Sequence, residues 1–151
     1  RLGWRVCDLD LLITEKEGMA IPEIFAGKGE AYFRRLEKEL LTTVLQGENL
    51  VVATGGGAVL DGENRRVMKE NGIMVYLRAE IKELCRRLGT GKGRPLLAGG
   101  ELEEILTRLA REREAFYREA QVTVDTQGLT PEAVAGEVIT AVFQDTGEKA
   151  L

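Results

Sequence analysis

The 151-residue sequence contains no histidine and only two cysteines, Cys7 and Cys85, which lie far apart. Without histidine, neither a Ser-His-Asp triad nor a Cys-His pair can form, and two distant cysteines give no zinc-ligand spacing. We therefore expect both cysteines to be reduced and structural. Any catalytic chemistry must depend on carboxylates, arginines, lysines and backbone amides.

The sequence also has no long hydrophobic run and no excess of positive charge. No apolar stretch approaches the ~20 residues of a membrane span, and no signal-peptide pattern opens the chain. The formal net charge is −4 and the pI is near 5.1, so the chain offers no overall basic field to nucleic acid or to an anionic membrane. With 44% hydrophobic residues, the sequence predicts a single cytoplasmic domain over residues 1–151.

Short apolar runs alternate with helical segments along the chain. The predicted strands are Arg5–Asp8, Leu50–Thr54, Ile73–Leu77 and Val122–Val124. The clearest predicted helices are a short one with Pro22 in its first turn that Gly27–Gly29 interrupts, one from Glu30 to about Gln46, and one from about Glu101 to Arg118. This alternation predicts an α/β fold in which helices cover both faces of a parallel sheet.

The segment most informative about function is Leu50–Val59, in which a β-branched run leads into the glycines Gly55–Gly57. Glycines in that position favour a loop whose exposed backbone amides bind a ligand over a segment that packs in the core. The alternative is a turn that only reverses the chain. Asp8 and Asp10 stand at the end of the first predicted strand. Because ligands collect at the carboxyl ends of parallel strands, these groups are predicted to face one crevice suited to a metal or a hydroxylated anion.

Two arginines lie on predicted helix faces that are otherwise apolar. Arg113 falls four residues after Leu109 and three before Phe116, so it should point inward and need an anionic partner. An internal ion pair or a snorkelling side chain is the alternative. Arg34 is similar, and Glu37, three residues further on, could fix its orientation or form a purely structural pair with it.

Residues 88–100 interrupt the alternation with closely spaced glycines, Lys92 and Arg94. Glycine at this density disfavours a packed helix and can hinge a mobile basic flap, whereas a simple surface connection is the alternative. The embedded Arg94–Leu97 segment is stiffer and partly apolar, which indicates a flap that closes onto a bound molecule.

Taken together, these residues resemble those of the shikimate kinase family, which belongs to the nucleoside-monophosphate-kinase-like P-loop enzymes. The segments that carry the resemblance, in order, are Asp8–Asp10, Ile21–Phe25, Gly29–Glu30, Phe33–Glu37, Ala53–Val59, Arg94–Leu97, Arg113–Tyr117 and Val124–Thr126. The resemblance implies a three-layer P-loop kinase architecture. It also implies a substrate-binding region at about residues 8–60 and a lid at about 88–100.

The resemblance implies a transferase that uses ATP and Mg²⁺ to phosphorylate the 3-hydroxyl of shikimate, in the biosynthesis of chorismate and the aromatic amino acids. Asp10 would accept hydroxyl protons of shikimate and help to activate the attacking oxygen, and Asp8 would act on the magnesium through water. Arg94 would neutralise charge on the transferring phosphoryl group. The expected partners are shikimate and ATP or ADP, with neither nucleic acid nor membrane, and the expected state is a monomer.

The implied substrate-binding residues are Asp10, Arg34, Gly55, Gly56, Gly57, Arg113, Phe25 and Phe33. The two arginines would clamp the shikimate carboxylate, the glycine amides would lie against the ring, and the phenylalanines would form apolar walls unless they only pack in the core. Arg87, Arg94 and Pro131 would contact the nucleotide.

The sequence departs from the family in one motif, the loop Gly-x-x-x-x-Gly-Lys-Ser/Thr that cradles ATP phosphates. In the family this loop, with the first strand and first helix, precedes the position where this chain begins, so Arg1 is expected to be an internal residue and the chain is expected to be inactive as given. The missing strand would lie between the strand ending at Gly55 and the strand near Ile73, leaving two inner edges unpaired. The alternatives are a non-catalytic domain that binds shikimate-like acids and a related small-metabolite kinase such as gluconate kinase.

Overall fold

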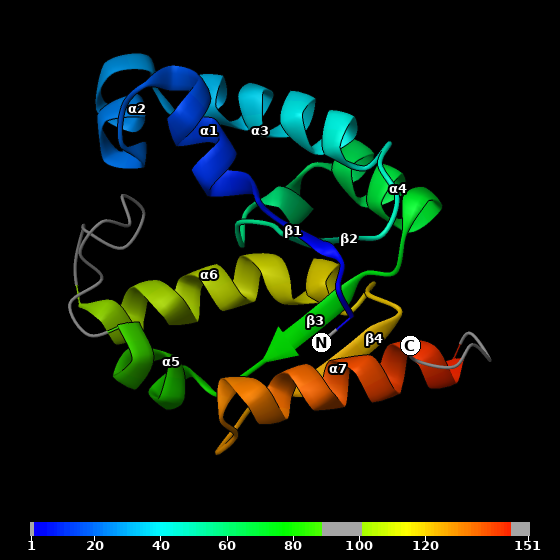
Figure 1. The fold of residues 1–151 in the computed structure, drawn as a ribbon. Coiled ribbons are helices and arrows are strands. Elements are labelled where there is room, and N and C mark those ends of the chain that lie inside the picture. Colours follow the sequence, from blue (N-terminus) through cyan, green and yellow to red (C-terminus); the bar gives the residue numbers. More distant parts are fainter. Residues whose placement is uncertain (1, 89–100, 146–151) are drawn as a thin grey trace.

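The computed structural model describes residues 2–88 and 101–145 (Figure 1). The elements are β1 (Arg5–Asp8), α1 (Leu9–Glu17), α2 (Ile21–Lys28), α3 (Glu30–Val44), β2 (Leu50–Ala53), the 3₁₀ turn η1 (Ala58–Leu60), α4 (Gly62–Asn71), β3 (Val75–Arg78), α5 (Ile81–Leu88), α6 (Leu102–Tyr117), β4 (Val122–Asp125) and α7 (Pro131–Asp145). The predicted alternation of strands and helices is confirmed. The predicted flap, with Arg94, lies outside the described residues except for Leu88 at the end of α5.

The four described strands form two separate parallel pairs. β1 pairs with β2, with Val6 opposite Val51, and β3 pairs with β4, with Val75 opposite Val122. The parallel direction that we predicted is confirmed. These strands do not form the single parallel sheet that we predicted, because β2 and β3 are not hydrogen-bonded to each other. This separation agrees with the expectation of two unpaired inner edges.

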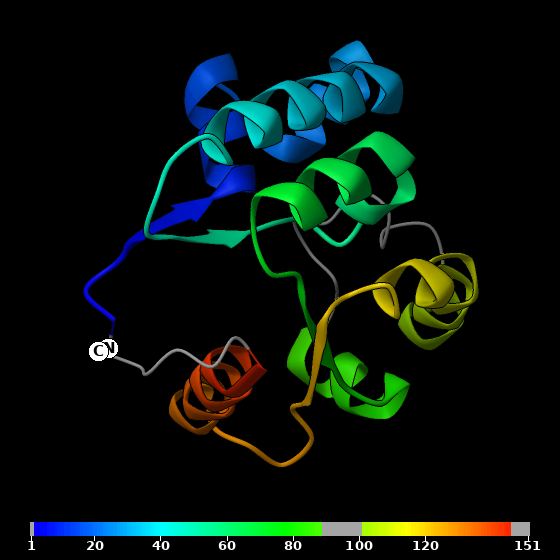
Figure 2. The same cartoon turned by 90° about the vertical axis from the view of Figure 1, so that its right-hand side faces the viewer.

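The helices divide between the two strand pairs. α1, α2 and α3 pack together beside β1 and β2, whereas α7 packs on β4 and α5 packs on α6. Figures 1 and 2 show α6 and α7 on opposite sides of the β3–β4 pair. The β1–β2 pair is less covered, since the facing residues Val6 and Val51 are 69% and 46% exposed. Within the described ranges, no helix has the length and apolar character needed to cross a membrane.

The larger hydrophobic core lies among α1, α2, α3, η1 and α4. Its buried residues are Leu9, Ile13, Ile24, Phe33, Leu36, Leu41, Val59 and Met68. A smaller cluster places Ile105 and Leu106 of α6 against α5. Because fully burying one such side chain contributes roughly 1.5–3 kcal/mol, the larger core fixes α1 and α3, the helices that carry several predicted site residues.

Local signals set the helix ends close to the site. Asp8 ends β1 and caps α1, since its Oδ1 accepts a hydrogen bond from Leu11 N at 3.2 Å. The predicted interruption at Gly27–Gly29 is confirmed, and the break falls at Gly29, whose φ of +86° suits glycine and whose N–H bonds to the carbonyl of Phe25 at 3.1 Å. Asp10 lies in the first turn of α1, two residues beyond the strand.

Trp4 connects two parts of the chain that are distant in sequence. This residue, the only tryptophan, precedes β1, and its ring meets that of Phe143 in α7 edge-on, with 6.0 Å between the centroids. The contact places α7 beside the segment that enters β1.

Candidate active site

The glycine loop leads from β2 into η1 and is closed by two backbone hydrogen bonds. Ala58 N donates to Gly55 O at 3.2 Å, and Leu60 N donates to Gly57 O at 3.1 Å. Its three glycines contact side chains of α1, α3 and α6. The loop is therefore the point at which Asp10, Arg34 and Arg113 meet.

Gly55 lies against two carboxylates. A Cβ atom placed on it would be 3.3 Å from Asp10 Oδ1 and 3.5 Å from Glu37 Oε2. Asp10 therefore lies next to the glycine loop, as predicted. A side chain at this position would be tight against Asp10 and in ordinary contact with Glu37.

Gly56 and Gly57 lie against the other side chains of the site. A Cβ on Gly56 would be 3.0 Å from Tyr117 Oη and 3.2 Å from Arg113 Nη1. A Cβ on Gly57 would overlap the guanidinium group of Arg34. These close approaches explain why glycine, rather than a residue with a side chain, occupies both positions.

Arg34 forms the ion pair that we gave as its alternative role. Its Nη1 donates to Glu37 Oε1 at 3.0 Å, and its Nη2 lies 3.6 Å from Glu30 Oε1. Glu37 is fully buried, with 1% of its surface exposed. The pair uses the terminal nitrogens, however, and Nε of Arg34 is buried without a hydrogen-bond partner in the described structure.

Arg113 points inward, as predicted, and is 8% exposed. Its Nε is also buried without a hydrogen-bond partner, and no carboxylate of residues 2–88 or 101–145 forms an ion pair with it. The alternative of an internal ion pair is therefore not realised in these ranges. Since arginine does not deprotonate in proteins, a buried guanidinium group of this kind favours an anion beside it.

The charges of the site interact with one another. Burial raises the pKa of Glu37 above its usual value, and the negative charge of Asp10 raises it further. Arg34 and Arg113 act in the opposite direction without overcoming burial. The site thus combines two acids and two arginines in a poorly hydrated setting.

The two predicted aromatic walls pack against each other. The rings of Phe25 and Phe33 have centroids 4.8 Å apart, and the Arg34 guanidinium carbon lies 5.3 Å from the Phe33 ring centroid. Phe33 is 4% exposed and belongs to the larger core, whereas Phe25 is half-buried against it. Core packing, the alternative role of Phe33, is therefore present.

The remaining predicted residues make other contacts. Arg87 donates from Nη1 to Thr126 Oγ1 at 3.0 Å and from Nη2 to Thr126 O at 2.9 Å, and Pro131 opens α7 shortly after. Asp8 uses one carboxylate oxygen to cap α1. Among the residues that the structure describes, no three His, Cys, Asp or Glu side chains are grouped so as to hold a metal ion.

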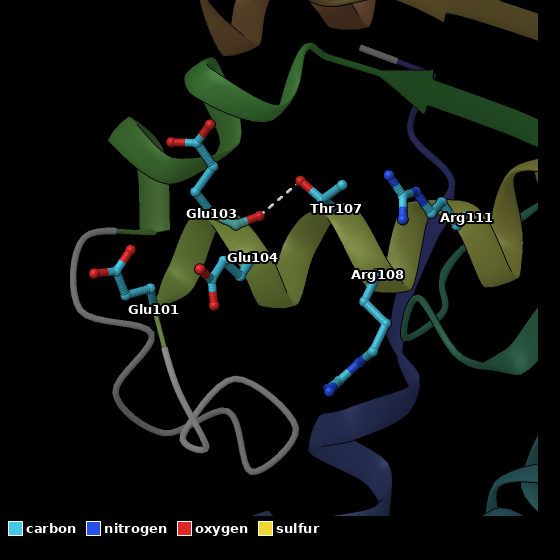
Figure 3. Close-up of a pocket in the computed structure, with 6 residues that line it drawn as sticks. All are labelled: Glu101, Glu103, Glu104, Thr107, Arg108 and Arg111. Atoms are coloured by element: carbon cyan, nitrogen blue, oxygen red, sulfur yellow. Dashed lines mark hydrogen bonds between the residues drawn. The ribbon is translucent and has the colours of Figure 1, made fainter.

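A surface depression on α6 contains none of the predicted site residues. Its lining is Glu101, Glu103, Glu104, Thr107, Arg108 and Arg111, which extend from the helix in Figure 3. Within it, Thr107 Oγ1 donates to the Glu103 carbonyl at 2.8 Å, a bond internal to the helix. The mixed charges of this lining give no single ligand chemistry.

Two contributions to the site were missed by reasoning from sequence. Tyr117 was named only at the end of the segment Arg113–Tyr117 and was given no role, yet its hydroxyl donates to Gly56 O at 2.6 Å. The spacing of four residues from Arg113 on one helix could have indicated a shared face. Arg65 donates to the Val59 carbonyl at 2.6 Å and so connects α4 to η1, a contact without an indication in the sequence.

The comparisons with known proteins agree with this geometry. The family model "Shikimate kinase" matches residues 1–143. A shikimate kinase of Geobacter metallireducens is 46% identical over 138 residues, covering 91% of this chain and 77% of that protein. One from Moorella thermoacetica is 40% identical over 137 residues, covering 91% and 79%.

Solved structures give the same result for the fold. Shikimate kinase from Acinetobacter baumannii in complex with shikimate superposes with a TM-score of 0.91 at 34% identity, covering 95% of this chain and 80% of that one. The Aquifex aeolicus enzyme gives a TM-score of 0.82 at 35% identity, with coverage of 96% and 84%. Matched in sequence and backbone over most of its length, the chain belongs to the shikimate kinase family, a family of phosphotransferases.

Proposed function

We propose that this protein transfers a phosphoryl group from ATP to the 3-hydroxyl of shikimate. Its family membership and the related structure that holds shikimate support this reaction. The observation that carries the substrate assignment is the pair of buried Nε–H groups on Arg34 and Arg113, which have no hydrogen-bond partner among the described residues.

The two guanidinium groups bind the substrate carboxylate in this proposal. Each is permanently charged and presents a planar set of N–H donors that matches a carboxylate. A buried donor without a partner costs roughly 1–3 kcal/mol, so an anion that accepts from both Nε–H groups removes that cost at two places. Glu37 holds the terminal nitrogen of Arg34 and leaves its Nε edge for the substrate.

Asp10 accepts hydrogen bonds from the shikimate hydroxyls, including the attacking 3-hydroxyl. Its carboxylate lies against Gly55, in the first turn of α1. Glu37 is less suited to this role, because it is bonded to Arg34 and burial raises its pKa. Amides of Gly56 and Gly57 add donors next to the two arginines.

The nucleotide and the metal are assigned to other residues. Shikimate kinases generally use ATP and Mg²⁺, and ATP supplies the transferable phosphoryl group. Magnesium keeps several waters and needs only one or two carboxylates, so the single carboxylate of Asp8 fits this use. Arg87 and Pro131 border the nucleotide base, and Arg94 stabilises the transferring group, although it lies outside the described residues.

Calorimetric titration with shikimate tests the substrate site. Arg113→Ala should weaken binding by about 30-fold to 1000-fold, equivalent to about 2–4 kcal/mol, because a desolvated carboxylate loses a forked donor. The matched control is Arg111→Ala on the same helix, since Arg111 is exposed and should leave affinity within about twofold. Equal affinities in both variants would refute the clamp.

A coupled assay of ADP formation separates a kinase from a domain that only binds shikimate-like acids. The proposed function requires that ADP appear only when shikimate and ATP are both supplied. Shikimate binding without any such turnover, measured on the full-length natural protein, would favour the non-catalytic alternative.

A further inference from the structure

Among the residues that the structure describes, Tyr117 is the one polar group against the glycine loop to which the proposed function gives no role. It lies one helical turn after Arg113 on α6, on the same face of the helix. Its hydroxyl donates to the carbonyl of Gly56 at 2.6 Å, a short and direct hydrogen bond. One turn of α6 therefore presents a guanidinium group and a hydroxyl to the same glycine.

The ring of Tyr117 is itself held in place from β3. It stacks on the ring of Tyr76, with 5.0 Å between centroids and an interplanar angle of 27°. The hydroxyl of Tyr76 donates to Glu114 Oε2 at 2.7 Å, and burial together with this carboxylate raises the pKa of Tyr76 to about 12. The orientation of the Tyr117 hydroxyl thus follows from packing outside the glycine loop.

The bonded carbonyl belongs to the peptide that joins Gly56 to Gly57. A peptide unit is planar and trans, so fixing the direction of its C=O also fixes the direction of its N–H, which belongs to Gly57. Glycines on both sides leave this unit few other restraints, because neither has a side chain that limits its rotation. The Tyr117 hydrogen bond is therefore well placed to stop the peptide from flipping.

We propose that Tyr117 is a positioning residue of the substrate site, which holds the Gly56–Gly57 peptide so that the Gly57 amide is presented to the bound carboxylate. The proposal rests on the proposed function, because it assumes that an anion binds between Arg34 and Arg113. Tyr117 acts through the backbone and needs no contact with the substrate.

The test compares two variants that each lose one hydroxyl from the same stacked pair. Tyr117→Phe removes the bond to Gly56 and keeps the ring, whereas Tyr76→Phe removes the bond to Glu114 and leaves the loop untouched. Circular dichroism establishes that both variants are folded. Calorimetry with shikimate should give an affinity about threefold to tenfold weaker for Tyr117→Phe, the range expected for one neutral hydrogen bond, and a change under twofold for Tyr76→Phe.

A second measurement reports on the peptide without any ligand. The ¹⁵N chemical shift of the Gly57 amide responds to hydrogen bonding at the preceding carbonyl, so it should move in Tyr117→Phe and stay in place in Tyr76→Phe. Wild-type affinity for shikimate in Tyr117→Phe, or an unmoved Gly57 resonance, would overturn the positioning role alone. Absence of shikimate binding by the wild-type protein would instead overturn the proposed function, and the positioning role with it.

Discussion

Replacing Gly57 by alanine should show that this position is glycine because of Arg34 and not because of the backbone. Gly57 has φ of −88° and ψ of −6°, a conformation open to any residue. At such a position, Gly→Ala by itself stabilises a protein by about 0.4–1 kcal/mol, because the unfolded chain loses freedom. The new methyl group, however, would overlap the Arg34 guanidinium group.

The magnitude follows from what Arg34 must give up when it moves. Its Nη1 bonds to Glu37 at 3.0 and 3.3 Å, and Glu37 would keep a buried carboxylate without its partner. Breaking a buried pair from one side costs about 3–5 kcal/mol, so after the backbone gain we expect Gly57→Ala to lower the free energy of unfolding by about 2–4 kcal/mol. Partial exposure of Arg34, 24% for its side chain, places the result toward the lower end.

Urea unfolding followed by circular dichroism measures this effect in two backgrounds. In the wild-type background Gly57→Ala should destabilise the chain. In the background R34A/E37Q, which removes the guanidinium group without leaving a buried charge, the same substitution should be neutral or stabilise by about 0.4–1 kcal/mol. A loss of the same size in both backgrounds would refute the steric argument and place the constraint in the backbone.

Two further predictions concern Glu37 and the exposed strand face. Burial raises the pKa of Glu37 above its usual 4.5, so the folded chain holds the proton of the Glu37 carboxyl group more tightly than the unfolded chain does. The contribution of this protonated group to stability is therefore complete below about pH 4.5 and is lost as pH rises through the pKa of Glu37 in the folded state. Between pH 4.5 and 7, urea unfolding should therefore show a larger loss of stability for wild type than for Glu37→Gln, and parallel pH curves would contradict this. Leu41→Ala should cost about 2–5 kcal/mol because Leu41 is 1% exposed, whereas Val6→Ala should change stability by under about 0.5 kcal/mol because Val6 is 69% exposed. A large loss in the Val6 variant would mean that another surface covers this strand face in solution.

The sequence predicted strands well where apolar β-branched residues are flanked by turn residues. β1 has the predicted bounds, and β4 extends only one residue further, to Asp125. β3 begins at Val75 rather than Ile73, because Met74 N bonds to the side chain of Gln121 at 2.8 Å and the strand ladder starts one residue later. A side chain that substitutes for a strand partner has no periodic pattern, so this shift could not be predicted.

The arginines of the candidate site were predictable because helical periodicity reports which face is buried. Arg113 interrupts an apolar stripe, and its burial is confirmed. For Arg34 the spacing to Glu37 predicted the ion pair that forms, but not that Nε would remain without a partner. The role of the Tyr117 hydroxyl needs the distance from α6 to the glycine loop, which depends on tertiary packing and has no local pattern.

The contact between Trp4 and Phe143 gives the molecule two separable optical reporters. Excitation at wavelengths that only tryptophan absorbs isolates Trp4, whose ring senses whether α7 stays beside the segment entering β1. The stacked rings of Tyr76 and Tyr117 lie instead beside the glycine loop and dominate tyrosine signals from that region. Spectroscopy on the unlabelled chain can therefore distinguish a ligand that rearranges the glycine loop from one that separates α7 from β1.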